Sequence, residues 1–290
     1  MSASDSTAAA SPGASGTSRA RDEIVRRYNV TVSGAGTRPM LFAHGFGCDQ
    51  NMWRYVAPAF EDDYRVILFD YVGSGRSRTH AYDLRRYTSL DSYARDVLSI
   101  ITALDLYDLV FVGHSVSAII GALVAKQQPQ RFAHLIMLAP SPRYVNDPPD
   151  YHGGFEHEDI AAMLEMMDHN YIGWADYLAP LIMKNEERPE LTRELSDSFC
   201  STDPRAARRF AEITFFADNR SDLSHVETPT LVVQVWDDAI APTSVGEFVN
   251  AALPHGTLRL LDATGHCPQL SHPAQTIEAM REYLAASAAA

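Results

Sequence analysis

Short apolar segments alternate with helix-like patterns along most of this chain, beginning near Ile24. Each segment is short, rich in β-branched or other large apolar residues, and bounded by Gly, Pro or Asp, which is typical of buried strands. The predicted strands are Met40–Phe42, Val66–Phe69, Leu109–Val112, Leu135–Leu138, Leu231–Val235 and Thr257–Leu261. Because such strands are apolar on both faces, they favour a mostly parallel sheet covered by helices on both sides.

The segments between the strands carry helical patterns. Residues 115–127 are apolar almost all around a helix, which indicates a buried helix that Pro129 terminates. Between about 141 and 225 the strands stop and several helical patterns follow one another, one of them starting at Asp203-Pro204. We therefore expect an α/β core of residues 22–140 and 226–290, with a helical lid at 141–225.

Residues 1–21 are mostly Ala, Ser, Gly and Thr. Such a segment buries too little surface to offset its ordering entropy, so we expect a disordered tail. It lacks the basic start and apolar run of a secretory signal, and no apolar stretch in the chain reaches the roughly 20 residues of a membrane span. The chain has only three cysteines, and so small and uneven a number does not indicate a disulfide framework. These features together predict a cytoplasmic protein.

The charge balance narrows the classes of partner. The chain has 24 basic and 37 acidic residues and a net charge of −13. Phosphate contacts need basic surface, so this balance argues against nucleic acid and against an anionic membrane surface as partners. No cluster of residues with metal-ligand spacing is evident, and we expect neither a metal nor another cofactor.

The segment Gly113-His114-Ser115-Val116-Ser117 lies between a predicted strand and the predicted buried helix. A sharp turn from strand to helix lifts one side chain off the end of the sheet, and the residues two before and two after it must be small. Gly113 and Ser117 meet this need, which makes Ser115 the candidate nucleophile. The alternative is that Ser115 only caps the helix, a role that serine favours.

The run Ala43-His44-Gly45-Phe46-Gly47 follows an earlier predicted strand. Acyl transfer places negative charge on a carbonyl oxygen, so donors must already face that position. We expect one donor to be the backbone N–H of Val116, directly after the nucleophile, and the second to be that of Phe46. The alternative for this run is an ordinary glycine-rich turn.

A nucleophilic serine needs a base, and the base needs an acid to orient it. His266 follows the last predicted strand, which suits the order of serine, acid and histidine found in hydrolases with a strand–helix nucleophile turn. The acid should follow the strand that ends at Val235, where Asp237 and Asp238 both stand. Spacing alone does not separate these two neighbours.

Three other polar residues near these motifs have structural explanations. His44 and His114 both precede the candidate serine in the chain, and we interpret them as structural. Asp70 ends another predicted strand, also before the serine, and we expect it to organise the turn at Gly73-Ser74-Gly75.

Several longer motifs resemble one family. They are Phe42–Asp49, Phe69–Gly75, Asn146–Pro149, Gly153–Phe155, Asn170–Trp174 and Phe199–Pro204. On these motifs the chain, over about residues 23 to 285, resembles the group of α/β-hydrolases around the bacterial sigma-B regulation protein RsbQ, whose wider kin are the plant strigolactone and karrikin receptors. The stretch around Ser115 looks more like the plant receptors, because the RsbQ pattern has Gly where Ser117 stands.

The resemblance implies an α/β-hydrolase fold with a four-helix lid over a hydrophobic pocket. It implies that the acid four residues before Pro242 belongs to the catalytic triad, which selects Asp238. The ligand it implies is a small hydrophobic ester or lactone, and the RsbQ-like role is in a general stress response, with a partner phosphatase that carries a sensory domain. By position, the pocket candidates are Phe46, Trp174, Tyr177, Phe215 and Phe216.

Three functions are compatible with these residues. The first is an ester or lactone hydrolase, in which Ser115 attacks and His266 carries the proton. The second is a ligand-sensing signalling protein with slow hydrolysis, which uses the same residues. Hydrolysis of a carbon–carbon bond is the third, because it can use the same triad.

Overall fold

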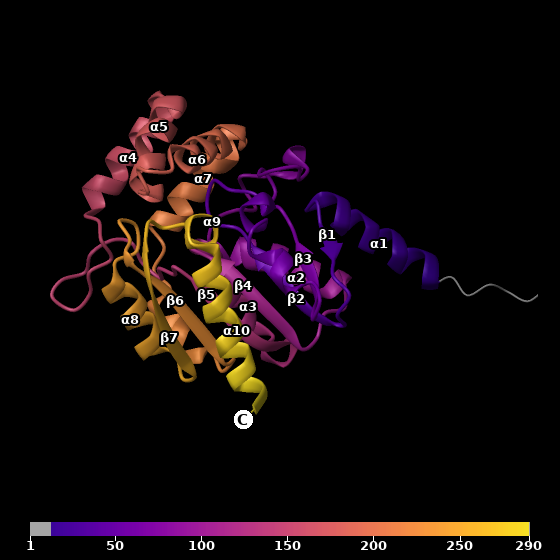
Figure 1. Cartoon of the computed structure of the whole chain (residues 1–290). Coiled ribbons are helices and arrows are strands. Elements are labelled where there is room, and N and C mark those ends of the chain that lie inside the picture. Colours follow the sequence, from indigo (N-terminus) through magenta and orange to yellow (C-terminus); the bar gives the residue numbers. More distant parts are fainter. Residues whose placement is uncertain (1–12, 290) are drawn as a thin grey trace, which may run out of the picture.

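A seven-stranded sheet forms the centre of the computed structural model, which describes residues 13–289 (Figure 1). The strands are β1 Thr31–Ser33, β2 Arg38–Ala43, β3 Tyr64–Leu68, β4 Leu109–His114, β5 Phe132–Leu138, β6 Thr230–Asp237 and β7 Gly256–Thr264. Their spatial order is β1-β3-β2-β4-β5-β6-β7, and all neighbours are parallel except β1 and β3. The predicted α/β fold is confirmed, whereas the short, exposed strand β1 was not predicted.

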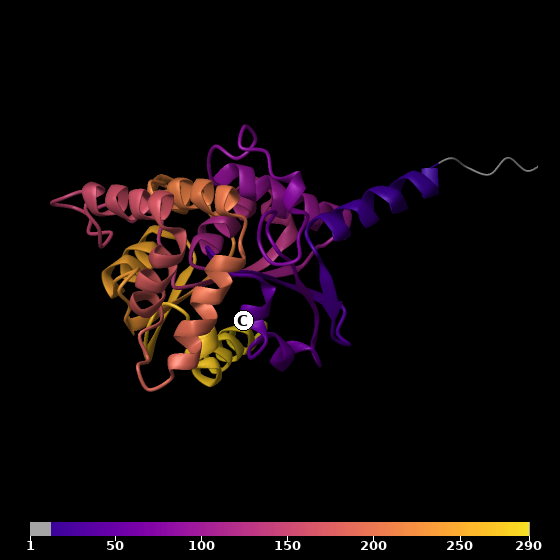
Figure 2. The same ribbon diagram turned by 90° about the horizontal axis from the view of Figure 1, so that it is seen from above.

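Successive side chains of each strand point to opposite faces of the sheet. Helices cover both faces, so each strand contributes side chains to two buried layers. Leu41, Phe111 and Met137 pack on the face covered by α2 Leu90–Ala103, α3 Val116–Gln127 and α8 Thr243–Ala252. Met40 and Val112 pack on the other face, against α10 Pro273–Ala289 and the short helices η1 Gln50–Trp53 and η2 Ala57–Phe60. Figure 2 shows these layers from above.

Four helices fill the segment between β5 and β6 and lie above one end of the sheet (Figure 1). They are α4 His157–His169, α5 Tyr171–Met183, α6 Pro189–Ser201 and α7 Pro204–Phe215. The side chain of Asp203 accepts hydrogen bonds from the amides of Arg205 and Ala206 and so caps α7, as its sequence suggested. These four helices, hereafter the helical insertion, occupy the region that the sequence predicts as an insertion.

The N-terminal prediction was partly wrong. Residues 1–12 lie outside the described residues, but helix α1 spans Gly13–Arg27 and therefore includes part of the segment expected to be disordered. Ile24 and Val25 pack against the core, and Glu23 pairs with Arg78 at 2.6 Å. These contacts anchor the last turns of α1, and Arg19, Ala20 and Arg21, which directly precede them, are good helix formers.

The remaining elements are short and connect the larger ones. They are η3 Thr79–Ala81, η4 Pro129–Arg131, η5 Arg220–His225 and α9 Pro268–Ser271. Within residues 13–289, none of the helices combines the length and apolar character required to traverse a bilayer.

Candidate functional site

Ser115 stands at the sharp turn between β4 and α3, with φ of 56° and ψ of −123°. A positive φ is strained for a residue with a side chain. A Cβ at Gly113 would collide with the backbone of Ser117, so only glycine fits where the strand and helix cross. The amide of Ser115 donates to the carbonyl of Leu138 in β5 at 2.8 Å, which ties the strained turn to the sheet. The sequence expectation of a strand–turn–helix around Ser115 is therefore met.

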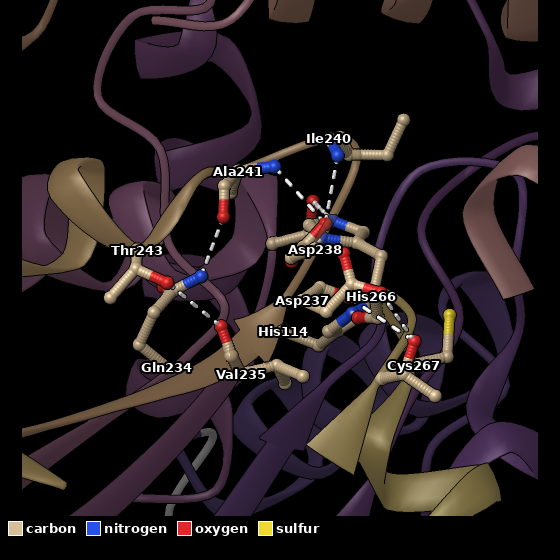
Figure 3. A network of polar contacts seen from close by, with 12 residues as sticks. His114, Gln234, Val235, Asp237, Asp238, Ile240, Ala241, Thr243, His266 and Cys267 are labelled. Carbon is tan, nitrogen blue, oxygen red and sulfur yellow. Dashed lines mark hydrogen bonds and ion pairs between the residues drawn. The ribbon is translucent and has the colours of Figure 1, made fainter. Parts of the chain in front are cut away.

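His266 joins two residues that are far apart in the chain. Its Nε2 lies 2.8 Å from the Oγ of Ser115, and its Nδ1 lies 2.7 Å from Oδ2 of Asp238. Asp238 follows β6 and His266 follows β7, and Figure 3 shows the two side chains beside each other. Ser115 follows β4, so all three residues come from the same end of the parallel strands. The Asp238 side chain is fully buried, and that of His266 is 5% exposed.

The loop after β6 fixes the orientation of Asp238 (Figure 3). Its Oδ1 accepts hydrogen bonds from the amides of Ile240 at 2.8 Å and Ala241 at 3.1 Å. Gln234 in turn donates from Nε2 to the carbonyl of Ala241 at 2.6 Å. With Oδ1 occupied in this way, Oδ2 is left for His266.

Asp237, the neighbour that spacing could not exclude, points elsewhere. Its side chain is 58% exposed and pairs with Lys184 Nζ at 2.5 Å and with Thr264 Oγ1 at 3.1 Å. The hydrogen bond from Lys184 is the main cause that lowers the pKa of this carboxyl. The structure thus places Asp238, and not Asp237, against the imidazole of His266.

His44 and His114 are both buried, and neither touches Ser115 Oγ through a hydrogen bond within the described residues. His114 donates from Nε2 to the backbone carbonyl of His266 at 2.8 Å. His44 accepts the amide proton of Tyr71 at Nε2, at 3.1 Å, so its Nδ1 donates to the carbonyl of Gly45 at 2.8 Å. Burial lowers the pKa of both rings. Their contacts fit the structural interpretation made from the sequence.

Ser117 and Tyr71 hold the loop that carries Phe46. The hydroxyl of Ser117 donates to the carbonyl of His44, and the hydroxyl of Tyr71 then donates to Ser117 Oγ at 3.0 Å. At Gly47 the backbone has φ of 70°, and a Cβ there would collide with the ring of Phe199. The loop is therefore shaped by glycine and anchored to the start of α3.

Asp70 is fully enclosed and accepts three hydrogen bonds from the surrounding loops. Its donors are the side chain of Asn29 at 2.7 Å, the amide of Gln50 at 2.8 Å and the amide of Arg76 at 2.9 Å. These contacts support its predicted role in organising the turn that follows β3.

A cavity lies beside Ser115 and His266. Its lining residues are Phe46, Cys48, His114, Ser115, Tyr144, Ile182, Leu195, Phe199, Thr214, Phe215, Ile240, His266 and Cys267. The free volume of this cavity is about 30 Å³. The helical insertion supplies five of these residues, the loop after β5 supplies Tyr144 and the α/β core supplies the other seven, so the cavity lies where the insertion meets the end of the sheet.

The structure divides the five pocket candidates into three groups. Phe46 and Phe215 line the cavity, and their ring centroids lie 5.8 Å apart. Trp174 is fully buried and packs its edge on Phe46 at 6.1 Å, behind the cavity wall. The expectations for Tyr177 and Phe216 were wrong, since they are 57% and 37% exposed. The inner side of α5 is occupied by smaller residues and Trp174, and Phe216 follows the end of α7 and packs on His157.

Two polar residues of the cavity were missed by the sequence analysis. Tyr144, in the loop after β5, places its hydroxyl 3.3 Å from Ser115 Oγ. Burial raises the pKa of Tyr144, so the phenol stays protonated and can donate to that oxygen. Thr214, on α7, also lines the cavity. An irregular loop and a polar position on an amphipathic helix carry no periodic signal that could have identified them.

The C-terminal end of α5 is bonded directly to the loop that carries His266. The amide of His266 donates to the carbonyl of Ile182 at 2.8 Å. Asn185, just beyond the helix, donates from Nδ2 to the carbonyls of Met183 at 2.7 Å and Thr264 at 2.9 Å. The helical insertion is thus connected by hydrogen bonds to the backbone on either side of Gly265.

Comparisons with known proteins agree with this architecture. Residues 38–273 match the family model described as the alpha/beta hydrolase fold. The chain is 38% identical to strigolactone esterase D14 of Arabidopsis thaliana, over 90% of this chain and 97% of that protein. It is 35% identical to the karrikin insensitive 2 receptor CA of Petunia hybrida, over the same shares of both chains.

A solved structure is similar over nearly the whole described chain. A hydrolase from Oleispira antarctica superposes with a TM-score of 0.89 and 44% identity, covering 91% of this chain and 96% of that one. The matched family model spans most of the sheet, the helical insertion, Ser115, Asp238 and His266. The chain therefore belongs to the α/β hydrolase family and is kin to the plant strigolactone and karrikin receptors and esterases.

Proposed function

We propose that this protein is a serine hydrolase that cleaves a small hydrophobic ester or lactone with Ser115, His266 and Asp238 as its catalytic triad. One observation carries the proposal: a buried imidazole lies 2.8 Å from a serine hydroxyl on one side and 2.7 Å from a buried carboxylate on the other. Such a chain of hydrogen bonds turns a weakly nucleophilic serine into a reactive one.

The chemistry follows from which atom holds each proton. His266 Nδ1 donates to Asp238, which leaves Nε2 free to accept the proton of Ser115 as its oxygen attacks the carbonyl carbon. The protonated imidazole then gives this proton to the leaving oxygen, and an acyl-serine remains. Water attacks the acyl-serine, and His266 takes a proton from that water. His266 then gives this proton to Ser115 Oγ as the acyl–oxygen bond breaks, which releases the carboxylic acid and regenerates the serine hydroxyl.

We propose that two backbone amides, those of Val116 and Phe46, stabilise the oxyanion. Val116 is the first residue of α3, so its N–H has no acceptor within the helix. The amide of Phe46 donates no hydrogen bond to another group within residues 13–289. A donor of this type is worth roughly 3–4 kcal/mol to the transition state in comparable hydrolases. These free amides support the oxyanion hole expected from the sequence.

The ligand class follows from the cavity and from the relatives. The lining is mostly aromatic and aliphatic and includes no Lys, Arg, Asp or Glu. An apolar site with a few polar groups suits a small neutral molecule. A similar protein is named a strigolactone esterase, which agrees with an ester or lactone as substrate.

The direct test is labelling and turnover. Wild-type protein should form an adduct with a fluorophosphonate at Ser115 and hydrolyse 4-nitrophenyl acetate. Ser115→Ala should lose both the adduct and the turnover, whereas Ser99→Ala, at a half-buried position of α2, should retain both. Intact mass spectrometry and circular dichroism separate loss of the nucleophile from loss of the fold. Undiminished turnover by folded Ser115→Ala protein would exclude this function.

A second candidate is a ligand sensor in which hydrolysis is slow and a protein partner reads the bound state. The relatives named as receptors favour it. We propose as partner a phosphatase with a sensory domain, in an RsbQ-like stress response. Binding of such a purified phosphatase should change when a butenolide lactone is added to wild-type protein. An affinity that is the same with and without the lactone, and the same for Ser115→Ala, would contradict the sensor function.

A further inference from the structure

Thr214 presents a buried hydroxyl that no protein group satisfies. The residue is 2% exposed, lines the cavity beside Ser115, and its Oγ1 has no hydrogen-bond partner within the described residues. It lies in the last turn of α7, where a threonine hydroxyl could bond back to a carbonyl of the preceding turn, yet it does not. Buried polar groups are nearly always paired, so this one requires an explanation.

The other polar groups of the cavity are accounted for. Ser115 and His266 bond to each other, and Tyr144 bonds to Ser115. His114 has an unpaired Nδ1, but a Cβ on Gly45 would collide with that atom, so the backbone of Gly45 covers it. Among the described lining residues, Thr214 is therefore the one whose free polar atom can serve an occupant of the cavity.

We propose that Thr214 is a specificity-determining residue, which selects esters or lactones bearing a second, neutral oxygen away from the scissile carbonyl. This inference rests on the proposed hydrolase function and adds the substrate class. A hydroxyl both donates and accepts, so it can bind a carbonyl, an ether or a hydroxyl oxygen. A purely hydrocarbon ligand would keep this hydroxyl unpaired and desolvated, which disfavours its binding.

The second oxygen must be neutral because no permanently charged side chain lines the cavity. The lining contains no Lys, Arg, Asp or Glu, its two histidines are His114 and the proposed base His266, and four of its members, Phe46, Phe199, Phe215 and Tyr144, are aromatic. Moving a carboxylate or an ammonium group into such surroundings without a partner is costly. The cavity also has little free space, about 30 Å³, so the second oxygen belongs to a compact ligand or displaces a water held by Thr214.

The test uses matched 4-nitrophenyl esters and isosteric variants. The pentanoate is compared with acyl chains of equal length in which one CH₂ is replaced by an ether oxygen or a carbonyl at successive positions. Wild-type protein should prefer at least one oxygen-bearing ester in kcat/KM. Thr214→Val removes only the hydroxyl and should reduce this preference by roughly 3- to 10-fold, the value of a neutral hydrogen bond. Thr214→Ser should restore it.

Thr228→Val is the matched control. Thr228 is also buried, and its Oγ1 also lacks a partner, but it precedes β6 at the opposite end of that strand from Asp238. Its substitution should leave the preference unchanged. A preference that is equal in wild-type and Thr214→Val protein, or the absence of any preference in the wild type, would overturn the proposal.

Failure of the hydrolase function gives a different result. If no ester is turned over and no phosphonate adduct forms, the methyl esters of the same acids are titrated calorimetrically into Ser115→Ala and Ser115→Ala/Thr214→Val proteins. Tighter binding of the oxygen-bearing ester that depends on Thr214 supports the specificity role without catalysis. Equal binding of both esters to both proteins rejects it.

Discussion

The carboxylate of Asp238 lies 2.7 Å from Nδ1 of His266 and receives two further hydrogen bonds, from backbone amides of its own loop. An aspartate held in this way fixes the tautomer of the imidazole and stabilises its protonated form during catalysis. We expect Asp238→Asn to reduce kcat by roughly 10³- to 10⁴-fold, as the loss of this function does in other triads. Steady-state hydrolysis of 4-nitrophenyl acetate measures the effect.

The neighbouring aspartate supplies a control for this prediction. Asp237 is largely exposed and pairs with Lys184, and such surface pairs contribute only about 0–1 kcal/mol. Asp237→Asn should therefore keep kcat within about twofold of the wild type, because the ion pair with Lys184 is weak and takes no part in the reaction. If Asp237→Asn were the more damaging variant, the assignment of the acid would be wrong.

The backbone strain at Ser115 predicts that stability depends on which residue occupies this position. With φ of 56°, this position suits glycine better than any residue with a Cβ. Neither Ser115→Gly nor Ser115→Ala can act as a nucleophile, but the glycine variant should be more stable than the alanine variant by about 1 kcal/mol. Urea unfolding of the two variants checks this difference, and equal midpoints would show that the turn stores no strain.

The two buried histidines predict a loss of stability in acid. Burial is the main cause that lowers the pKa of His44 and His114; for His114 the charge of His266 lowers it further, and for His44 the carboxylate of Asp70 partly opposes the shift. In the unfolded chain both titrate near 6.5. The unfolded state therefore takes up protons first as the pH falls, so stability is complete above about pH 6.5 and declines below it, by about 1 kcal/mol per pH unit and histidine.

Urea titrations at pH 7, 6 and 5 measure this decline. His114→Gln keeps a donor that can reach the carbonyl of His266 but does not titrate, so its stability should fall less steeply with acid. His152→Gln, at an exposed position, should have the wild-type slope. A slope unchanged by His114→Gln would mean that His114 is not held neutral in the folded protein.

Substitution of Asn185 measures how strongly the hydrogen bonds of the helical insertion stabilise the loop that carries His266. It is 5% exposed, has φ of 53°, and bonds to the carbonyls of Met183 and Thr264. Asn185→Gly keeps the backbone conformation but loses both hydrogen bonds, which should cost about 1–3 kcal/mol and lower kcat. Asn185→Ala adds backbone strain and should be less stable still. Urea unfolding and kcat are measured on both variants; full stability and activity in Asn185→Gly would show that these bonds are dispensable.

The sheet and the nucleophile turn could be predicted because both have strong local signals. Six strands were recognised since each is a short apolar run, and Ser115 was found because small residues flank it where a strand meets a helix. Strand β1 gave no such signal, since its three residues are exposed. Helix α1 was missed in part because its stability comes from packing against the core and not from its composition.

The site was harder to predict where contacts between residues far apart in the sequence determine the direction of a side chain. Asp237 and Asp238 are adjacent in sequence, but Asp237 ends β6 and pairs with Lys184, whereas Asp238 lies in the loop that follows and reaches His266. Tyr177 and Phe216 are aromatic residues in the right segment, yet each falls on an outer surface. Thr214 is a polar residue whose importance arises only from the hydrophobic walls around it, and no sequence pattern contains that information.

The hydrogen bond from the His266 amide to the Ile182 carbonyl links the end of α5 directly to the loop that holds the imidazole. If α5 shifts away from the sheet to admit a molecule, this bond must lengthen or break, and the imidazole loses one of its main-chain restraints. Proton transfer is then best aligned only after the helix has returned. A bound product that keeps α5 displaced would therefore slow proton transfer by His266 and, at the same time, change the exposed surface of the protein.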